Sequence, residues 1–466
     1  MNLAGLKRFA PVAVLGATIA LSLTAIGQVQ DSSRARMLDR MIAQGLTDCG
    51  AYRFLAELTR CAPHRLSGSR GADSAIAFAK AAMEECGFTR VHLEPVMVPH
   101  WERGPVESAQ AVTGKKKSVP LSVCALGGSV ATPPGGVIAP VLEVHSLDEL
   151  TRMGEAAKGK IVFYDRPMDA AKLRTFEAYS GAVDQRSRGP SEAAKAGALA
   201  VLVRSMTLAL DDVPHTGALD YAANVKKIPA AAISTKGAEL LSALLKDSKD
   251  VRVHLTLTCR ELPDAPSSNV VGDIVGTEKP NDIIVVSGHL DAWDKGQGAM
   301  DDGAGCVQAL EALNLIRKMN LAPLRTIRAV LFINEENGLR GGRAYPLDPR
   351  RSSEHHVAMI ESDAGGFAPR GFGVAGDSLV LAHVTRWKYL LDVLGAGLLT
   401  PGRGAADISP MIRTGVPGLA LDVEDQRYFD YHHSDKDTIE KVNPRELELG
   451  AIAEAILAYQ IAQEGL

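Results

Sequence analysis

Histidine and carboxylate side chains follow three apolar runs in the second half of the chain. In chain order they are His289 with Asp291, Glu335 with Glu336, and Asp363. Two further segments add Asp301 beside Asp302 and His433 beside His432. Imidazole nitrogens and carboxylate oxygens without a thiolate suit zinc or another divalent first-row metal. Since a single catalytic zinc needs only three protein ligands, a set of five predicts two ions that share one carboxylate.

Each of these side chains has an ordinary structural explanation when it is taken alone. A single His after a strand is usually a surface or core residue, a Glu-Glu pair is usually a solvated turn, and Asp-Asp-Gly is commonly a helix cap. Their common position argues against this explanation, because ligands of a parallel α/β sheet bind at the carboxyl ends of its strands. We therefore expect a metal site at one edge of a sheet.

Alternating apolar runs and helical periods in the second half of the chain predict the sheet that positions these side chains. Strands are expected at 283–287, 326–333, 357–360 and 418–423, and helices at 304–319, 379–394 and 444–463. Such alternation indicates an α/β fold with a parallel sheet covered by helices. A mostly helical segment at 37–85 precedes it, and the polar residues 63–69 within that segment are interpreted as a plain connection.

A different pattern between two Pro-rich stretches predicts an inserted domain. A Thr-Pro-Pro-Gly-Gly cluster at 132–136 opens it, and a Pro/Ser-rich stretch at 263–268 closes it. The runs inside are shorter, with strands expected at 137–144, 160–164, 198–203, 228–233 and 251–259, and a helix at 237–246. The insertion is therefore assigned to 131–263, and 32–130 with 264–466 to one discontinuous domain.

The N-terminus has the pattern of a secretory signal peptide at 1–27. Lys7 and Arg8 precede an apolar run at 9–26, and the small residues Ala25 and Gly27 suit cleavage after Gly27. The alternative is an uncleaved anchor helix, which the shortness of the run disfavours. We expect a secreted or periplasmic protein with no stable membrane insertion after cleavage.

Composition excludes several other classes of protein. The chain has 466 residues, of which 46% are hydrophobic and 23% charged, as in ordinary globular proteins of two or three domains. Its 51 basic and 55 acidic residues give a net charge of −4, so nucleic acid is not an expected partner. The six cysteines contain no CxxC pair, which disfavours a thiolate metal site and favours free thiols.

The motifs around the candidate ligands resemble those of the zinc peptidase family M28, and most closely its carboxypeptidase Q branch. The closest matches are Ser-Gly-His-Leu-Asp-Ala-Trp-Asp at 287–294 and Gly-Gln-Gly-Ala-Met-Asp-Asp-Gly at 296–303. Further matches are Glu-Glu at 335–336, Glu-Ser-Asp-Ala-Gly at 361–365 and His-His-Ser at 432–434. The resemblance extends over the mature chain, but its specific motifs begin near residue 268.

The resemblance implies a role for each residue of the set. The implied ligands of two zinc ions are His289 and Asp363 for one ion, Glu336 and His433 for the other, and Asp301 as the bridge. Glu335 would be the general base that takes a proton from the attacking water and delivers it to the leaving amine. Asp291 would orient the imidazole of His289. His432 is not included among the ligands.

The resemblance also implies an architecture and an activity. The fold would be a three-layer α/β zinc-exopeptidase domain with a mixed, mainly parallel sheet. The insertion would be a protease-associated (PA-like) α/β domain that covers the cleft and influences substrate size or the formation of a homodimer. The expected activity is that of a secreted dinuclear zinc exopeptidase that hydrolyses dipeptides or short peptides.

Three alternatives stay open on the sequence. The first is an aminopeptidase that acts on the N-termini of longer peptides, and the second is a non-catalytic binding protein on the same fold. The third is a transferase like glutaminyl cyclase, whose active site would resemble one that holds a single zinc ion. The Arg-Gly-Ala-Ala stretch at 403–406 departs from the branch, so recognition of the substrate's end stays open as well.

Overall fold

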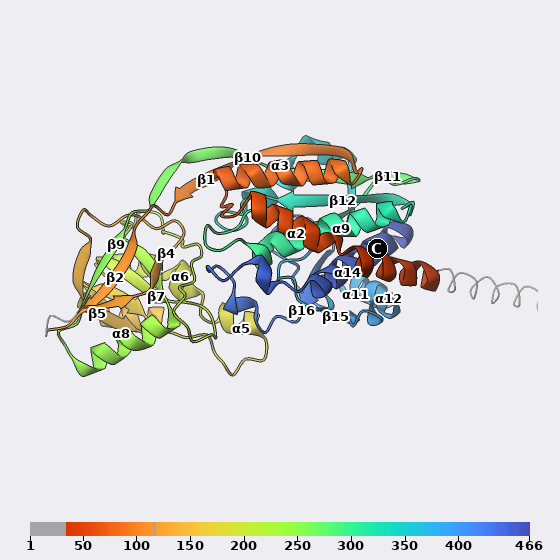
Figure 1. Cartoon of the computed structure of the whole chain (residues 1–466). Helices are drawn as coiled ribbons and strands as arrows, with labels where there is room; N and C mark the ends of the chain where they lie inside the picture. The colour runs from red at the N-terminus through yellow and green to blue at the C-terminus, as the bar shows by residue number, and fades with distance from the viewer. Residues whose placement is uncertain (1–33, 115–117) are drawn as a thin grey trace, which may run out of the picture.

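Strands of this chain collect in two eight-stranded sheets, one in each of two lobes that lie end to end (Figure 1). The structure is a computed structural model and describes residues 34–114 and 118–466. The predicted signal peptide at 1–27 lies outside the described residues. Within the part of the chain that is described, no helix is long and apolar enough to cross a membrane.

The larger lobe is built on a sheet whose central strands run parallel. Its order is β1, β10, β12, β11, β13, β16, β14 and β15. The bounds are Thr89–Glu102 for β1, Arg260–Ile274 for β10, Lys279–His289 for β11, Arg325–Phe332 for β12, His355–Glu361 for β13, Pro369–Ala375 for β14, Leu398–Pro401 for β15 and Gly418–Val423 for β16. β12, β11, β13 and β16 pair in parallel, whereas β10 and β14 run antiparallel to their inner neighbours. The central strands are buried on both faces, so they appear in the sequence as continuous apolar runs.

Helices cover both faces of this sheet. The longer ones are α2 (Gly50–Cys61), α3 (Arg70–Glu85), α9 (Ala304–Lys318) and α14 (Pro444–Glu464), of which α9 and α14 are buried along most of their length. On the opposite face, Tyr345 after α10 (Arg340–Ala344) and Met411 of α13 (Ser409–Ile412) pack over Val285 and Met359. The predicted three-layer α/β fold with a mixed, mainly parallel sheet is confirmed.

The predicted helix at 379–394 is in fact two helices, α11 (Ser378–Thr385) and α12 (Lys388–Asp392). The chain turns between them at Trp387, whose ring is buried and whose Nε1 donates to Glu464 at 3.0 Å. Asp377 begins α11 by accepting hydrogen bonds from two N–H groups of its first turn. We attribute the break to the burial of Trp387 against the end of α14.

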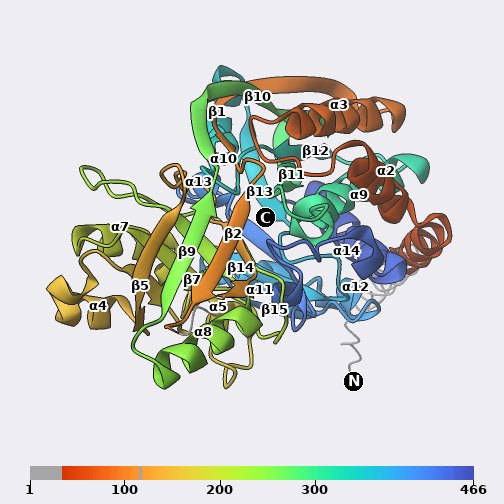
Figure 2. The ribbon, with the colours of Figure 1, turned by 60° about the vertical axis from the view of Figure 1, so that its left-hand side comes forward.

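The smaller lobe carries the second mixed sheet, with the order β3, β2, β9, β5, β6, β7, β8 and β4. The bounds are Glu107–Val112 for β2, Ser118–Leu121 for β3, Val123–Ala125 for β4, Val137–Val144 for β5, Ile161–Tyr164 for β6, Ala200–Arg204 for β7, Ala230–Ile233 for β8 and Arg252–Leu257 for β9. Its helices are α4 (Leu147–Met153), α5 (Thr175–Ser180), α6 (Asp184–Ser187), α7 (Gly189–Lys195) and α8 (Thr235–Asp247). Figure 2 brings β2, β9 and β5 to the front, and Phe163, Leu202 and Val253 belong to a core cluster that extends to Trp101 and Trp293 at the lobe contact.

The structure differs from the predicted boundaries of the insertion at 131–263. Strands β2, β3 and β4 precede residue 131, yet they belong to the smaller lobe's sheet. The stretch at 263–268, predicted as the closing linker, lies within β10 and pairs with β1. β1 and β10 form a two-stranded ribbon with open edges here, and proline is tolerated on such edges. The prolines at 263 and 266 therefore mark a strand, and not a linker.

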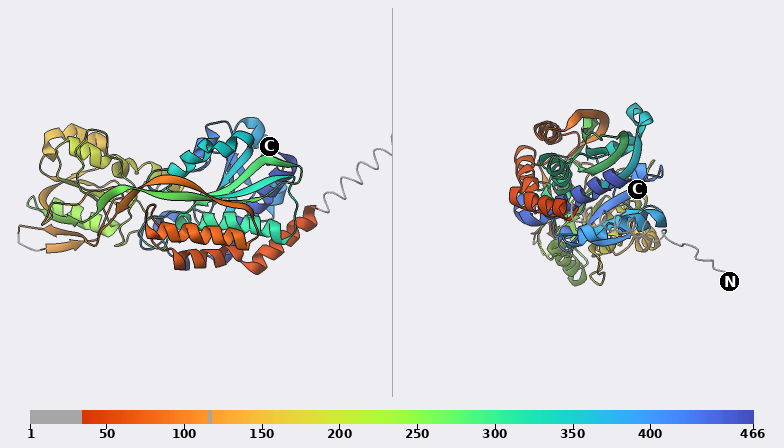
Figure 3. Two further views of the ribbon diagram at one scale, coloured as in Figure 1. Left: turned by 90° about the horizontal axis from the view of Figure 1, so that it is seen from above. Right: turned by 90° about the vertical axis from the view of Figure 1, so that its right-hand side faces the viewer.

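The ribbon of β1 and β10 joins the two lobes (Figure 3), and side chains beside it fix their contact. The rings of Trp101 and Trp293 meet edge to face, with centroids 6.4 Å apart. Arg103 donates to both carboxylate oxygens of Asp294, at 2.8 and 2.5 Å. Trp293 also fills the space beside Gly127, where a Cβ atom would lie 1.7 Å from the ring. The smaller lobe is thus attached next to the loop that follows β11.

Candidate metal centre

Three neighbouring strands of the larger sheet end at the same edge and carry the candidate ligands. His289 is the last residue of β11, Glu335 and Glu336 lie in the turn after β12, and Asp363 follows β13 by two residues. Because β12, β11 and β13 are adjacent and parallel, their carboxyl ends meet. The structure therefore brings these side chains together at one edge of the sheet.

The first group of donor atoms lies around His289. Its Nε2 atom is 3.3 Å from Oδ1 of Asp301 and 3.6 Å from Oδ1 of Asp363. This nitrogen is buried and has no hydrogen-bond partner among the described residues. Nδ1 on the other side of the ring lies 3.0 Å from the main-chain carbonyl of Asp291, which leaves Nε2 free to bind a cation.

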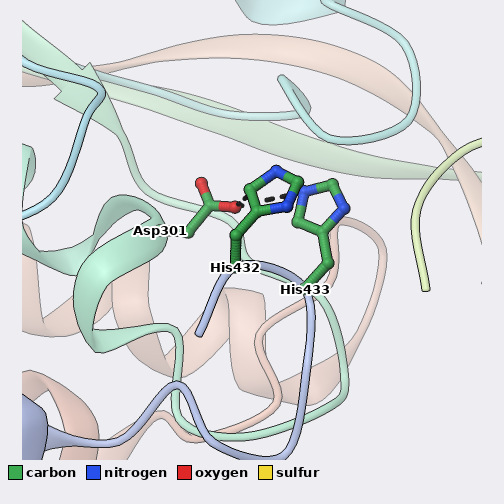
Figure 4. Close-up of side chains that lie close together, drawn as sticks. All are labelled: Asp301, His432 and His433. Atoms are coloured by element: carbon green, nitrogen blue, oxygen red, sulfur yellow. Dashed lines mark ion pairs between the residues drawn. The ribbon is translucent and has the colours of Figure 1, made fainter. Parts of the chain in front are cut away.

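The second group lies around His433 and uses the other oxygen of Asp301. Nε2 of His433 is 3.1 Å from Oδ2 of Asp301 and 3.0 Å from Oε2 of Glu336. Figure 4 shows Asp301 facing the stacked rings of His432 and His433. Nε2 of His432 lies farther from Oδ2 of Asp301, at 3.6 Å, so His433 is the better placed of the two histidines.

The spacing of these atoms fits zinc. Zinc binds nitrogen and oxygen at about 2.0–2.2 Å in a tetrahedral arrangement, which places two ligand atoms about 3.4 Å apart. The four separations around His289 and His433 range from 3.0 to 3.6 Å. Asp301 offers one oxygen to each group, so the five side chains form two adjoining sets of donors. The donor types and the spacing of these side chains therefore suit zinc.

Neighbouring carboxylates hold the main chain around Asp301. Oδ2 of Asp302 accepts a hydrogen bond from the main-chain N–H of His289, and Oδ1 accepts one from that of Gly305. The Asp302 carboxylate also lies within reach of the donor atoms of His289 and Asp363. Asp437 accepts from the N–H groups of Met300 and Asp301, at 2.6 and 3.1 Å. The peptide bond between Asp301 and Asp302 is cis.

Arg65 stabilises the same loop from a segment that we interpreted as a plain connection. Its guanidinium is buried and donates to the main-chain carbonyls of Leu290, Gln297 and Gly298, at 2.6, 2.6 and 2.7 Å. These carbonyls span the loop between His289 and Asp301. Main-chain acceptors leave no mark on the sequence, so a lone arginine in a polar segment was the only available signal.

The contacts of Asp291 differ from those implied by the resemblance. Its main-chain carbonyl, and not its carboxylate, lies on Nδ1 of His289. The carboxylate instead accepts a hydrogen bond from the N–H of Glu335 at 3.1 Å. Asp291 thus touches both a candidate ligand and the turn that carries the proposed base.

Burial and charge set the protonation of the remaining groups. Burial raises the pKa of Glu335 well above its ordinary value, and the nearby carboxylates of Asp363 and Glu336 raise it further. Burial lowers the pKa of His432 well below its ordinary value, and the adjacent His433 has the same effect, so His432 is neutral.

The candidate ligands and Glu335 line a cavity of about 250 Å³. Phe176, Tyr179 and Arg186 of the smaller lobe form part of its wall, and Tyr428 and Phe429 complete the aromatic side. A second cavity of about 500 Å³ shares Glu335 and Glu336 with the first. Both cavities therefore border the proposed base, and both lobes contribute to the first.

Comparison with known proteins identifies the family of this chain. The sequence model of Peptidase family M28 matches residues 269–460. Carboxypeptidase Q of Bos taurus is 37% identical over 428 residues, which cover 92% of this chain and 88% of the relative. Carboxypeptidase Q of Xenopus laevis is 38% identical over 428 residues, with 92% and 89% covered.

Solved structures show the same likeness. The Peptidase M28 precursor from Shewanella amazonensis superposes with a TM-score of 0.87 at 33% identity, over 93% of this chain and 98% of that one. BSAP, a zinc aminopeptidase from Bacillus subtilis, has a TM-score of 0.64 at 19% identity, over 89% and 95%, and shares the fold. The chain therefore belongs to peptidase family M28, in its carboxypeptidase Q branch, and is a metallo-exopeptidase.

Proposed function

We propose that this protein is a zinc exopeptidase that uses two zinc ions and hydrolyses dipeptides or short peptides. The observation that carries the proposal is the division of five donor side chains into two groups that share Asp301, with Glu335 beside them and outside both groups. The names of the similar proteins, carboxypeptidase Q and a zinc aminopeptidase, agree with a zinc-dependent exopeptidase.

Each group in the site has a distinct task in peptide hydrolysis. Zinc, when bound here, would polarise the scissile carbonyl and lower the pKa of the attacking water. Glu335, which lines the cavity beside both donor groups, takes a proton from that water and delivers it to the leaving amine. The N–H of Glu335 is held by Asp291, which fixes the turn that aims the carboxylate.

The size of the first cavity favours short substrates. Its volume of about 250 Å³ is below the range of about 300–1,000 Å³ that is usual for ligand pockets. Side chains of the smaller lobe close one side of it, so a folded protein has no access on that side. We propose that this lobe is a PA-like domain that limits the length of the substrate. We also propose that the protein forms a homodimer.

Export is the remaining part of the proposal, and it depends on the signal-like segment at 1–27. The mature protein is expected in the periplasm or outside the cell. Sequencing the N-terminus of the protein recovered from these fractions tests this, and a chain that still begins at Met1 would contradict cleavage.

The Glu335→Gln variant tests the catalytic assignment. Loss of the base should lower kcat on a dipeptide by about 10²–10⁴-fold, because general-base catalysis contributes about that much. Zinc content should remain near two ions per chain, since Glu335 belongs to neither donor group. The exposed Glu440→Gln is the matched control and should leave both quantities unchanged.

The same preparation separates the alternatives. Retained activity of Glu335→Gln would reject its role, and one zinc ion per chain with cyclisation of an N-terminal Gln peptide would favour a cyclase. Turnover of long peptides with free N-termini, and not of N-blocked dipeptides, would favour the aminopeptidase. A wild-type protein that binds zinc and cleaves no peptide would favour the binding protein.

A further inference from the structure

Arg186 of α6 is a buried cation in the wall of the cavity that holds the candidate ligands. Its side chain is buried, with the whole residue 7% exposed. Nη2 donates to the hydroxyl of Tyr179 at 2.7 Å, and Nη1 donates to the carbonyl of Thr216 at 3.4 Å. Its Nε has no hydrogen-bond partner in the described part of the chain. Neither contact carries a negative charge.

The part of the protein that the structure describes offers this guanidinium no counter-ion. Across the described ranges, no Asp or Glu oxygen lies within 4.0 Å of Arg186. Asp301 and Glu336, which line the same cavity, are engaged with His433 and, in the proposed function, with zinc. Arginine is rarely buried without an anionic partner. A ligand with a negative charge would supply the partner that the described residues lack.

The surroundings of Arg186 suit one end of a small peptide. Gly217 separates its Nη1 from Nδ1 of His433, and a Cβ atom at Gly217 would lie 2.3 and 2.8 Å from these two nitrogens. The guanidinium is thus a near neighbour of a candidate metal ligand. Stacked aromatic rings, Tyr179 with Phe429 and Phe176 with Tyr428, form an apolar wall beside it.

We propose that Arg186 binds a carboxylate of the substrate, and that the smaller lobe thereby selects peptides that present a negative charge close to the scissile bond. The planar fork of guanidinium donors matches a carboxylate. The α-carboxylate of a dipeptide places its charge at the shortest distance from the peptide bond, and we assign it as the source. This assignment rests on the proposed peptidase function and adds the group that reads the end of the substrate.

Three dipeptides of matched size test the assignment. The wild-type enzyme should cleave alanyl-leucine with a higher kcat/KM than alanyl-leucine amide, by about 10- to 100-fold, as expected for one charge-assisted contact. In Arg186→Gln this preference should disappear because kcat/KM for alanyl-leucine falls. The kcat/KM for alanyl-leucine amide should change less than about threefold. Alanyl-glutamate amide separates the sources, because a preference for it over alanyl-leucine amide would overturn the α-carboxylate in favour of an acidic side chain.

Arg188→Gln is the matched control. Arg188 lies two residues away and is exposed. Its replacement by Gln removes the same charge, so the substrate preference of this variant should equal that of the wild type. Tyr179→Phe keeps the ring and removes the hydroxyl that orients Nη2, so it should weaken the preference for the free acid in a protein whose Arg186 is intact.

Equal losses on acid and amide, together with lower zinc content, would overturn the proposal. Arg186 would then act on His433 through the carbonyl of Thr216, which lies 3.4 Å from both side chains. If the wild-type protein cleaves none of the three peptides, the proposed function fails first. Calorimetric titration of the zinc-loaded protein with alanyl-leucine then tests whether Arg186 binds the α-carboxylate. Equal affinity of the wild type and Arg186→Gln for this peptide would reject that role.

Discussion

The two proposed ligand histidines hold protons when no metal is bound. Burial alone would lower their pKa values, but neighbouring carboxylates outweigh it, so the pKa of His289 is raised well above its ordinary value and that of His433 rises to about 10. Only a neutral imidazole binds zinc. Zinc binding at neutral pH should therefore release about two protons, and the apparent affinity should increase as the pH rises toward about 10. Calorimetry in buffers of different ionisation enthalpy measures this release.

Variants assign the released protons to residues. His433→Ala should release about one proton fewer than the wild type. The exposed His355→Ala serves as the control and should release the same number as the wild type. A release near zero would show that the imidazoles are already neutral before zinc binds.

The sequence predicts the location of side chains that follow strands better than that of side chains that bind main-chain carbonyls. His289, Glu336 and Asp363 meet because parallel neighbours end at one edge, and their role as ligands stays a prediction. Arg65 and Arg186 were missed. The first binds only carbonyls, and the second lies in an insertion without a motif, so only the fold reveals what either touches.

Elements were predictable where burial dictates the pattern. The strand expected at 418–423 coincides with β16, since a largely buried strand forms an apolar run. The strand expected at 137–144 coincides with β5, which is mostly apolar although it is only partly buried. The ribbon of β1 and β10 was missed because its proline-containing, partly exposed strands resemble a linker. The break between α11 and α12 depends on the burial of Trp387 by a distant helix, which local periodicity does not encode.

Helix α14 contains a carboxylate whose removal should stabilise the protein. Glu454 is fully buried, and neither of its oxygens has a hydrogen-bond partner among the described residues. Burial raises its pKa well above the ordinary value, and the charge of Glu361 adds to this. In the folded protein Glu454 therefore keeps its proton at pH values where the unfolded chain has lost it. The free energy of unfolding falls as the pH rises from the ordinary pKa of a glutamate toward the raised pKa of Glu454 in the folded protein.

Glu454→Met keeps the length of the side chain and removes the ionisable group. We expect it to raise the free energy of unfolding by about 1–3 kcal/mol near neutral pH, with a smaller gain at pH 5. Urea unfolding at both pH values measures this, and Glu446→Met, at a partly exposed position in the first turn of the same helix, is the control. Destabilisation by Glu454→Met at both pH values would show that the carboxyl group makes a favourable contact.

At the scale of the whole molecule, the smaller lobe takes part in building the site. Its residues Thr216 and His215 bind the His432–His433 loop, since the N–H of Thr216 donates to the carbonyl of His433 and the ring of His215 lies 2.7 Å from the carbonyl of His432. Trp293 links the same loop to the lobe contact, with its ring 5.8 Å from that of His433. The N–H of Trp293 donates to Glu336 at 3.3 Å. A change at the lobe contact should therefore reach one donor group and spare the other.

Gly127→Ala tests this coupling, because its methyl group would displace Trp293, and Trp293 contacts both His433 and Glu336. Overpacking of this kind costs about 1–3 kcal/mol, so thermal unfolding should occur at lower temperature. Zinc titration should show weaker binding of one ion, while the ion at His289 and Asp363 keeps its affinity.

Gly114→Ala, where the nearest atom to the new methyl group lies at 3.4 Å, is the control and should match the wild type. Equal weakening of both ions would mean that the displacement of Trp293 spreads through Asp301, and unchanged binding of both would mean that the lobe contact does not position His433.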